Sequence, residues 1–599
     1  MDKDKLSAMG AWTGGTVVDL AVCGDTVLAA TFAGIYTSTD GGRTWKLTGK
    51  NLPDWFVQTV ALAPVGEQAF GLAASHLGWL YRSIDGGETW ELDAYWSNMG
   101  IITRLVASPH FGSDGIIFAC TEQDGVYKSV DRGSSWKSAN FGLLNLSVST
   151  LCFSPDFEQD EVLFAGTDGG GLFRSRNAGR AWRESGTGLP DSAVQCLGIS
   201  PRFGEDGTVF AGTEEAGVYI STDGGRNWAP ASESLAESCI NALYVADDWD
   251  NGGSIIAAAD GGLLYSTDKG QTWQPTAGGP EYPYVLAKCG ATILTGAYKD
   301  GVYASHDGIN WTAYNEGLSA HLPPMAIFST DFCQDGTAVM ASMEGELVGS
   351  TDGGKTWTAL EEEFAVSSMA STGAGTSMAL LAAAEGTLLY SPDAGQTWQS
   401  ARSTGTDTLT AVAFGSGGET LAATASGQVF VGSIENPGGQ RIGKIGEMVV
   451  AIAAVSSGDD LLPVVATAAQ QDDGWLLNLR RGVDGALLFS QQANEPIAAL
   501  YPLPGERLLC SLGSVVVVVD RGMVLNVSTL EVDAPVACLG AAVDTLLAGS
   551  RFGLFCSNNG GASWEWLTSD ISAVALHTEP NGRVTVVEMG GRIWRVDVE

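Results

Sequence analysis

The sequence predicts an all-β protein built from two tandem seven-bladed β-propellers, with about fourteen four-stranded blades in all. Three observations predict this fold: abundant glycine, few charged residues, and an eight-residue motif that returns at a nearly constant spacing. Glycine accounts for 79 of 599 residues and charged residues for 17%. This composition suits short strands joined by tight turns, and a chain of this length requires several domains or a repeat array.

The repeated motif is S-x-D-x-G-x-x-W, first found as "STDGGRTW" at residues 38–45. Asn177 and Asn559 replace the aspartate in two copies. The first nine copies end in tryptophans that stand 38 to 46 residues apart, and a tenth follows after a longer gap. A fixed period of this length indicates one supersecondary unit per repeat. The motif residues are Asp40, Trp45, Asp85, Trp90, Asp131, Trp136, Trp182, Asp223, Trp228, Asp268, Trp273, Asp307, Trp311, Asp352, Trp357, Asp393, Trp398 and Trp564.

Each repeat reads as four strands, which together form one propeller blade. In residues 193–231, three apolar, β-branched runs alternate with turns rich in Gly, Asp and Pro, and a fourth strand begins at the tryptophan. The motif then falls on the turn between the third and fourth strands. There the carboxylate accepts backbone N–H groups, glycine supplies the unusual backbone angles, and tryptophan anchors the hairpin. We therefore interpret the motif as a structural turn.

Blades without the motif complete the count. Residues 409–433, 448–481 and 497–522 read as three degenerate blades, and the Trp564 blade and a last one from Ile571 follow them. Fourteen blades exceed the four to eight that one ring usually holds, so two rings of seven are expected.

The ends of the chain indicate how the rings close. The last blade shows three strands, and the N-terminal stretch "SAMGAWTGG" supplies the missing fourth. This pairing predicts a first propeller of residues 1–280 plus 571–599 and a second of residues 281–570. The alternative is a simpler division near 319–325.

Charge and cysteine usage limit the classes of partner. The net charge is -38, from 31 basic and 69 acidic residues, which argues against nucleic acid or anionic lipid and is compatible with a basic protein surface or peptide. Ten cysteines are scattered singly with no C-x-x-C pair, and no secretory signal or membrane-spanning run is visible. We expect a cytoplasmic protein with reduced thiols and no membrane insertion. We expect no cofactor and no metal site, because the five histidines lie far apart and each motif offers one carboxylate.

The candidate binding residues lie on the loops between the second and third strands and on the connections between blades. Acids recur on these loops, and aromatic residues and a histidine accompany them, which suggests a rim that grips a basic peptide or stacks on sugar rings. The alternative is that the acids only solvate turns and the aromatics fill gaps between blades. The rim candidates are Glu122, Asp124, Asp168, Glu214, Glu215, Asp260, Asp300, Trp55, His76, Trp79, Tyr95, Trp96, Tyr282 and Tyr284.

The ten motif copies resemble the Asp-box, or bacterial neuraminidase, repeat, and "SPRFGEDGTVFAGTEEAGVYISTDGGRNW" at residues 200–228 is typical of it. The resemblance covers nearly the whole chain and implies a propeller, since sialidases, xyloglucan-cleaving endoglucanases, sortilin-like receptors and photosystem II assembly factors all carry the repeat. The chain lacks the Arg-Ile-Pro tripeptide of sialidases.

The two-ring xyloglucanases resemble the expected architecture, and their catalytic aspartates come one from each ring, across a shared cleft. In that family one aspartate lies in a stretch similar to T-D-V-G-G-A-Y-R, whereas this chain reads "TFAGIYTS" at residues 31–38, with Phe32 in its place. We therefore expect a non-catalytic protein-binding or assembly platform. A glycan-binding or glycoside-hydrolysing protein of the xyloglucanase type and a structural subunit of a larger complex remain as alternatives.

Overall fold

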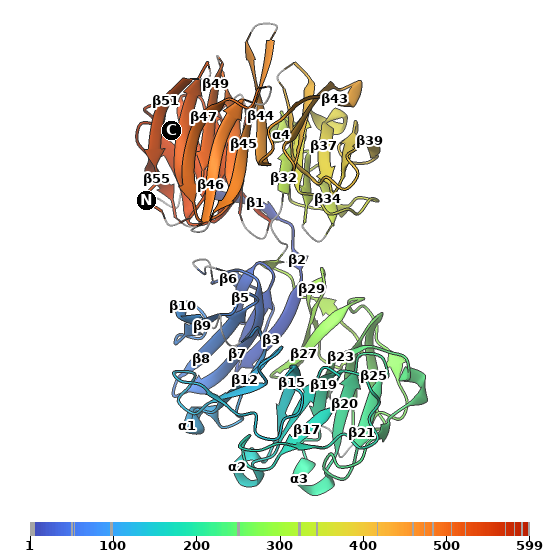
Figure 1. Ribbon diagram of the computed structural model, residues 1–599. Coiled ribbons are helices and arrows are strands. Elements are labelled where there is room, and N and C mark those ends of the chain that lie inside the picture. Colours follow the sequence, from blue (N-terminus) through green and yellow to red (C-terminus); the bar gives the residue numbers. More distant parts are fainter. Residues whose placement is uncertain are drawn as a thin grey trace. The chain divides into compact units, whose positions relative to one another are not determined.

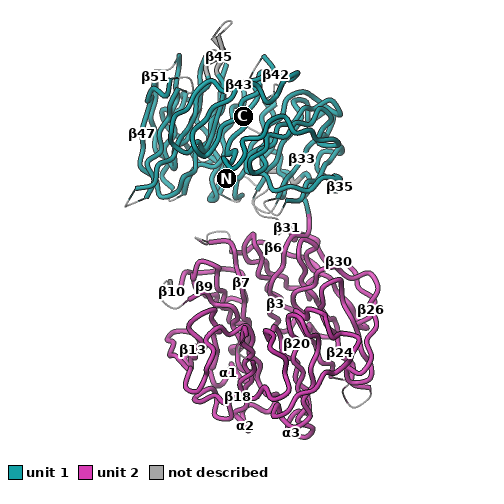
Figure 2. Tube along the Cα trace, turned by 45° about the vertical axis from the view of Figure 1, so that its right-hand side comes forward, with its two compact units in different colours: residues 1–12, 321–599 teal, residues 13–320 magenta. Residues whose placement is uncertain are grey.

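Two compact units make up the computed structural model, residues 13–320 and residues 1–12 with 321–599 (Figures 1 and 2). The structure describes residues 6–596 apart from 50, 51, 53, 96–99, 170, 248, 250, 251, 321–324, 343, 344, 416, 458, 459, 472, 473, 482, 483, 505, 522, 533, 570, 580, 581, 589 and 590. Over these residues the chain forms fourteen four-stranded sheets, seven in each unit. The tandem seven-bladed fold is thus confirmed.

We number the sheets as blades 1 to 14. Blade 1 consists of β3 (Val17–Cys23), β4 (Thr26–Thr31), β5 (Gly34–Ser38) and β6 (Lys46–Leu47), blade 2 of β7 (Val57–Val65), β8 (Gln68–Ser75), β9 (Trp79–Ser83) and β10 (Glu91–Tyr95), and blade 3 of β11 (Ile102–Ala107), β12 (Ile117–Thr121), β13 (Val126–Ser129) and β14 (Lys137–Ser138). Blade 4 consists of β15 (Val148–Phe153), β16 (Leu163–Thr167), β17 (Leu172–Ser175) and β18 (Arg183–Glu184), and blade 5 of β19 (Val194–Ile199), β20 (Val209–Thr213), β21 (Val218–Ser221) and β22 (Ala229–Pro230). Blade 6 consists of β23 (Ile240–Val245), β24 (Ile255–Ala259), β25 (Gly262–Ser266) and β26 (Gln274–Pro275), and blade 7 of β27 (Pro283–Cys289), β28 (Thr292–Ala297), β29 (Gly301–Ser305) and β30 (Thr312–Ala313).

Blade 8 consists of β32 (Met325–Phe328), β33 (Ala338–Ala341), β34 (Leu347–Ser350) and β35 (Thr358–Ala359), blade 9 of β36 (Ser368–Thr372), β37 (Ala379–Ala384), β38 (Thr387–Ser391) and β39 (Gln399–Ser403), and blade 10 of β40 (Leu409–Phe414), β41 (Glu419–Thr424), β42 (Gln428–Ser433) and β43 (Asn436–Lys444). Blade 11 consists of β44 (Met448–Ser457), β45 (Asp460–Gln471), β46 (Gly474–Arg481) and β47 (Leu487–Ala493), and blade 12 of β48 (Ala498–Leu503), β49 (Arg507–Leu512), β50 (Val515–Asp520) and β51 (Met523–Thr529). Blade 13 consists of β52 (Val536–Ala542), β53 (Thr545–Ser550), β54 (Gly553–Ser557) and β55 (Glu565–Thr568), and blade 14 of β56 (Ala573–Thr578), β57 (Val584–Glu588), β58 (Arg592–Val596) and β1 (Leu6–Ala11).

The Asp-box turn lies between the third and fourth strands and is held by a fixed set of hydrogen bonds. In blade 1, Ser38 Oγ donates to Asp40 Oδ1 at 2.8 Å and accepts the Gly42 N–H at 2.9 Å. Asp40 also accepts the backbone N–H of Thr44 at 3.0 Å and its hydroxyl at 2.7 Å. These bonds satisfy the polar groups of a turn whose glycines have positive φ.

The box tryptophan joins its blade to the preceding one. Trp228 is buried, and its Nε1 donates to the backbone oxygen of Ser185 at 2.7 Å, just beyond the outer strand of blade 4. Trp45 makes the same bond to Tyr314 at 2.8 Å and thereby connects blade 1 with blade 7. The indole therefore fills the gap between two outer strands and pairs its one polar group there.

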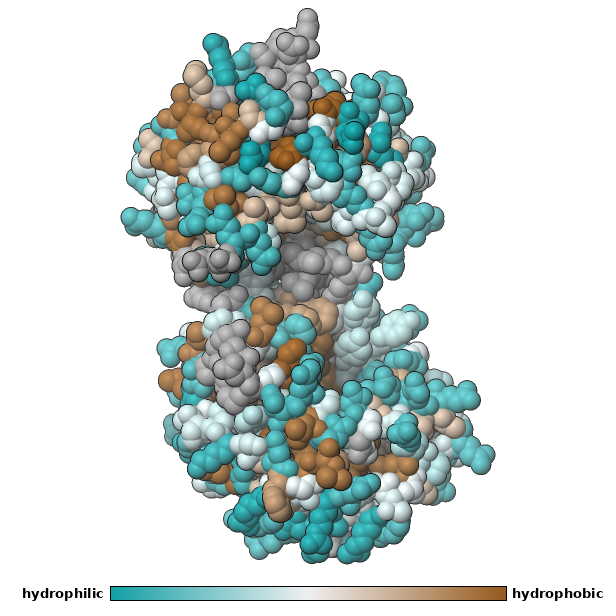
Figure 3. Space-filling model, viewed as in Figure 1, coloured by the Kyte–Doolittle hydropathy of each residue, from teal (hydrophilic) through white to brown (hydrophobic). Residues whose placement is uncertain are grey.

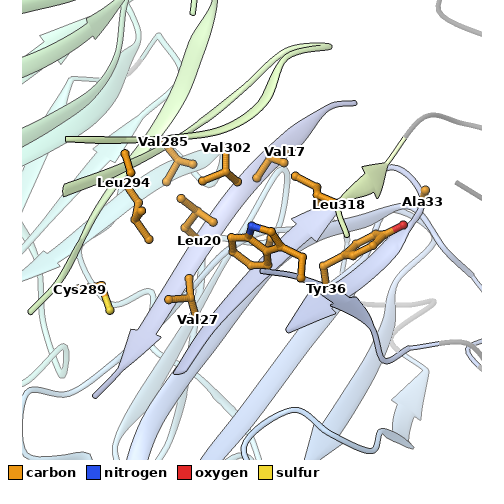
Figure 4. Packing of buried hydrophobic residues seen from close by; sticks show 13 residues of the cluster. Val17, Leu20, Val27, Ala33, Tyr36, Val285, Cys289, Leu294, Val302 and Leu318 are labelled. Carbon is orange, nitrogen blue, oxygen red and sulfur yellow. The ribbon is translucent and has the colours of Figure 1, made fainter. Parts of the chain in front are cut away.

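The two units close differently. In the unit of residues 13–320, blades 1 and 7 bury a shared cluster that includes Leu20, Leu294 and Leu318 (Figure 4). A short parallel pair of β2 (Gly14–Gly15) and β31 (Ser319–Ala320) lies beside it. In the other unit, β1 pairs antiparallel with β58 and completes blade 14, as the sequence predicts.

The division of the chain differs from the one expected first, 1–280 plus 571–599 and 281–570. Blade 14, with its N-terminal strand, belongs to the unit of residues 321–599, and the boundary near residue 320 matches the alternative division. The short interval between Trp273 and Trp311 has a local cause. The β27–β28 hairpin turns tightly, with Cys289 paired to Thr292, where blades 3 to 5 insert a helical turn.

One-turn helices between the first and second strands are a feature that the sequence analysis did not anticipate. They follow a pattern S-x-x-F-x-x-D, in which the serine hydroxyl donates to the aspartate and the phenylalanine is buried, as in Ser200, Phe203 and Asp206 (2.8 Å). None of the helices in the described ranges is long and apolar enough to cross a membrane. The helices are α1 (Phe111–Asp114), α2 (Phe157–Asp160), α3 (Phe203–Asp206) and α4 (Phe332–Asp335).

We predict that Trp228→Ala destabilises blade 5 by about 3–5 kcal/mol, because it removes a buried aromatic side chain and leaves the Ser185 carbonyl without its donor. Urea denaturation, with hydrogen exchange resolved to residues 193–231, measures the loss. Trp566→Ala is the control, since that side chain is 41% exposed, and we expect a clearly smaller effect. Equal losses would contradict the assigned role of the box tryptophan.

The box carboxylates predict a stability loss at acidic pH. Hydrogen bonds from the side chain and backbone of Ser135, Thr272 and Thr356 lower the pKa of Asp131, Asp268 and Asp352, each to about 2. An unfolded aspartate titrates near about 3.9. The stability that these three ionised carboxylates give the folded protein is therefore fully present above that pH and is lost as pH falls toward 2. The triple Asp→Asn variant should show a flatter decline in melting temperature between pH 4 and 2. Parallel curves for variant and wild type would contradict the prediction.

Candidate binding rim

A central channel of about 280 Å³ runs between the first strands of blades 1 to 7. Each blade contributes residues from its innermost strand, among them Asp19, Arg104, Thr150, Asn241 and Leu286. The mouth of the channel at the start of these strands is where the sequence analysis placed the candidate rim.

One backbone hydrogen bond fixes a rim position in successive blades. The residue that follows the second strand donates its N–H to the carbonyl of the residue directly before the first strand. Glu122 donates to Ile101 at 3.0 Å and Glu214 donates to Ala193 at 3.1 Å. His76, Asp168, Asp260 and Tyr298 make the equivalent bond. We call these six residues, together with Phe32 at the same position of blade 1, the inner rim.

The inner rim divides into two arcs. Blades 3 to 6 contribute four acids in succession, of which Asp168, Glu214 and Asp260 are exposed and Glu122 is half-buried. Two of the acids on adjacent blades influence the same thiol: burial raises the pKa of Cys239 to about 11, and the charges of Asp260 and Glu214 add to this.

The second arc, from blades 7, 1 and 2, is aromatic. The Phe56 ring stacks on His76 with centroids 4.9 Å apart and lies 4.1 Å from Phe32. The Tyr284 and Tyr298 rings are 6.1 Å apart. The face therefore combines a charged half with a half suited to aromatic or apolar contact.

The remaining candidates occupy several environments. Asp124, Glu215 and Asp300 lie farther along the same loops, where the carbonyls of Asp124 and Asp300 accept asparagine side chains. Trp79 begins β9, is half-buried and packs against the buried cluster between blades 1 and 2.

The aromatic candidates on the blade connections also differ. Tyr282 is exposed, and its carbonyl accepts the N–H of Tyr298. Trp55 lies half-buried between β6 and β7. Tyr95 pairs with Trp79 through the backbone, and Trp96 lies outside the described residues.

A polar network below the rim was not predicted. Asp19 is nearly inaccessible, and its carboxylate accepts the Thr59 hydroxyl at 2.7 Å and the Val60 N–H at 3.1 Å. The Arg104 guanidinium lies 3.4 Å from the same carboxylate. The pair places a compensated charge in the channel wall and links blades 1, 2 and 3. Within the described ranges, no group of three or more His, Cys, Asp or Glu side chains is arranged to hold a metal ion.

Comparison with known proteins agrees with the fold and the turn motif. The BNR/Asp-box repeat family matches residues 36–47 and 264–275. The chain thus carries BNR/Asp-box repeats within two seven-bladed propellers. A search of curated protein sequences gave no match.

Solved structures similar to the whole Asp-box chain include two GH74 enzymes. The GH74 xyloglucanase of Xanthomonas campestris gives a TM-score of 0.69 at 16% identity, over 99% of this chain and 100% of that one. The GH74 enzyme of Niastella koreensis gives 0.70 at 16% identity, over 99% of each chain. PorZ, a bacterial surface component of the type-IX secretion system of Porphyromonas gingivalis, gives 0.56 at 12% identity, over 99% of this chain and 87% of that one. At these identities the similarity establishes the fold alone.

Proposed function

We propose that this Asp-box protein is a non-catalytic binding platform, and that the inner rim of blades 1 to 7 receives a basic segment of a partner protein. The observation that carries the proposal is the acidic arc, one carboxylate on each of four consecutive blades. Lysine and arginine side chains complement such an arc, and a net charge of -38 raises their rate of encounter. The aromatic arc offers contacts to the apolar stems and rings of the same segment.

The residue at position 32 supports a non-catalytic role. The resemblance to xyloglucanases implies an aspartate at this position, whereas Phe32 packs its ring against Phe56. Hydrolysis with two carboxylates requires both of them.

A second candidate is a glycan-binding or glycoside-hydrolysing protein of the xyloglucanase type. The specific observation in its favour is the full-length match to the GH74 enzymes. The exposed Tyr282 and the other aromatic residues of the rim are suited to stacking on sugar rings.

The rim proposal predicts that Glu122→Gln, Asp168→Asn, Glu214→Gln and Asp260→Asn, combined in one variant, weaken binding of a basic peptide by at least about tenfold, because four charge pairs at the protein surface are lost. The probe is a fluorescein-labelled peptide of alternating lysine and tyrosine, and fluorescence anisotropy is measured at several salt concentrations.

The matched control neutralises four exposed acids away from the rim, Glu67, Glu91, Glu158 and Glu184, which gives the same change in net charge. We expect this control to retain most of the affinity. Equal affinity of the two variants would contradict the rim proposal, and release of reducing ends from xyloglucan by the wild type would favour the second candidate.

A further inference from the structure

We call the gap between the outer strands of two neighbouring blades a seam. In blades that carry an Asp-box, the box tryptophan fills this gap. Trp182 Nε1 donates to the carbonyl of Ala139, beside the outer strand of blade 3, at 2.7 Å. In the other unit, Trp564 of blade 13 donates to Ser528 Oγ on β51 of blade 12 at 2.9 Å. At each of these seams an indole covers the apolar edge and donates one hydrogen bond to the preceding outer strand.

The seam between blades 11 and 12 lacks this tryptophan. Blade 12 has no Asp-box: β50 passes into β51 through a short turn in which Asp520 pairs with Met523. The sequence contains no tryptophan between Trp475 and Trp564. No side chain of the box type is therefore available to cover β47 and β51.

The apolar side chains at this seam remain exposed as a result. Val527 pairs with Val517, whose side chain belongs to the buried cluster between blades 11 and 12, so both lie on the face toward blade 11. Leu525 and Val527 are 54% and 51% exposed. On the facing blade, the half-buried Leu488 and Phe489 of β47 pack against the same cluster. Figure 3 shows hydrophobic residues gathered on the side of this unit where Figure 1 draws β47 and β51.

The edge of β51 is also suited to strand pairing. It is the last strand of its sheet and spans seven residues without a charged side chain, whereas the outer strands of blades 3 to 7 span two. Within the described residues no further strand pairs with its outer edge. A long, uncharged, apolar edge offers a row of backbone donors and acceptors to an added strand.

Charge indicates the kind of occupant. Exposed acids lie next to both strands of the seam: Asp484, which is paired with Arg481, precedes β47, and Glu531 follows β51, and the chain carries a net charge of -38. A second copy would bring the same acids together, whereas basic residues beside an apolar strand would complement them.

We propose that the seam between β47 and β51 binds an extended segment of a partner protein. The segment adds a strand to β51, places one aromatic side chain where the box tryptophan lies in other blades, and carries lysine or arginine beside it. This site lies in a different unit from the inner rim and does not depend on the rim proposal. If the chain is a structural subunit of a larger complex, this seam is where we expect another subunit to attach.

A fluorescein-labelled peptide, Lys-Thr-Val-Thr-Trp-Thr-Val-Lys, tests the seam by fluorescence anisotropy with the full chain. We expect saturable binding that falls at least about tenfold in the Leu525→Lys/Val527→Lys variant and by a similar factor when the peptide tryptophan is replaced by alanine. The substituted side chains are exposed, so the melting temperature should not change. The matched control, Thr312→Lys/Ala313→Lys on the exposed outer strand of blade 7, should bind as the wild type does.

Three results would overturn the proposal. These are absence of saturable binding, equal affinity of the Leu525→Lys/Val527→Lys variant and the wild type, or equal affinity of the tryptophan and alanine peptides. Sedimentation velocity of the protein without peptide tests whether a second copy of the chain occupies the seam instead. Dimerisation of the wild type that the same double substitution abolishes would assign the seam to a second copy and also overturn it.

Discussion

The packing of a box indole between neighbouring blades is the interaction on which the outer part of the structure depends, and in blades 1, 2, 4, 5 and 13 the indole also donates a hydrogen bond to the preceding blade. A propeller blade is joined to its neighbours by packing between sheet faces, and this packing weakens toward the periphery where the strands diverge. In blades 4 and 5 the box places a large apolar side chain in the gap and pairs its N–H with a carbonyl at 2.7 Å. The serine and aspartate of the box hold the turn that positions the indole, so the repeated residues act as scaffold.

Local patterns predict the blades well and the division into rings poorly. The spacing of the motif correctly indicates fourteen blades, and the three-stranded last blade correctly indicates pairing with the N-terminal strand. Both divisions of the chain preserve these pairings. The observed one depends on the packing of blade 7 against blade 1, for example of Leu294 with Leu20, which no local pattern encodes. The helical turns carry a readable signal, S-x-x-F-x-x-D, which the fourfold recurrence of the pattern makes recognisable.

The candidate site shows the same limit. The sequence identifies acids on the correct loops, but it does not distinguish Glu122 from Asp124, because the backbone bond to Ile101 selects the rim position. Once that position is known, Tyr298 and Phe32 join the rim, and the division into acidic and aromatic arcs follows. Asp19 and Arg104 lie on first strands separated by more than eighty residues of sequence, and only ring closure brings them together.

In the proposed function, recognition takes place on the inner rim while the boxes serve as scaffold. Hydrogen-exchange mass spectrometry of the protein with and without the lysine–tyrosine peptide tests it most directly. We expect slower exchange in the loops at 121–125, 167–171, 213–217 and 259–262, with the box turns of the same blades unchanged. Slower exchange confined to the box turns, or no change in the four loops at saturating peptide, would contradict it.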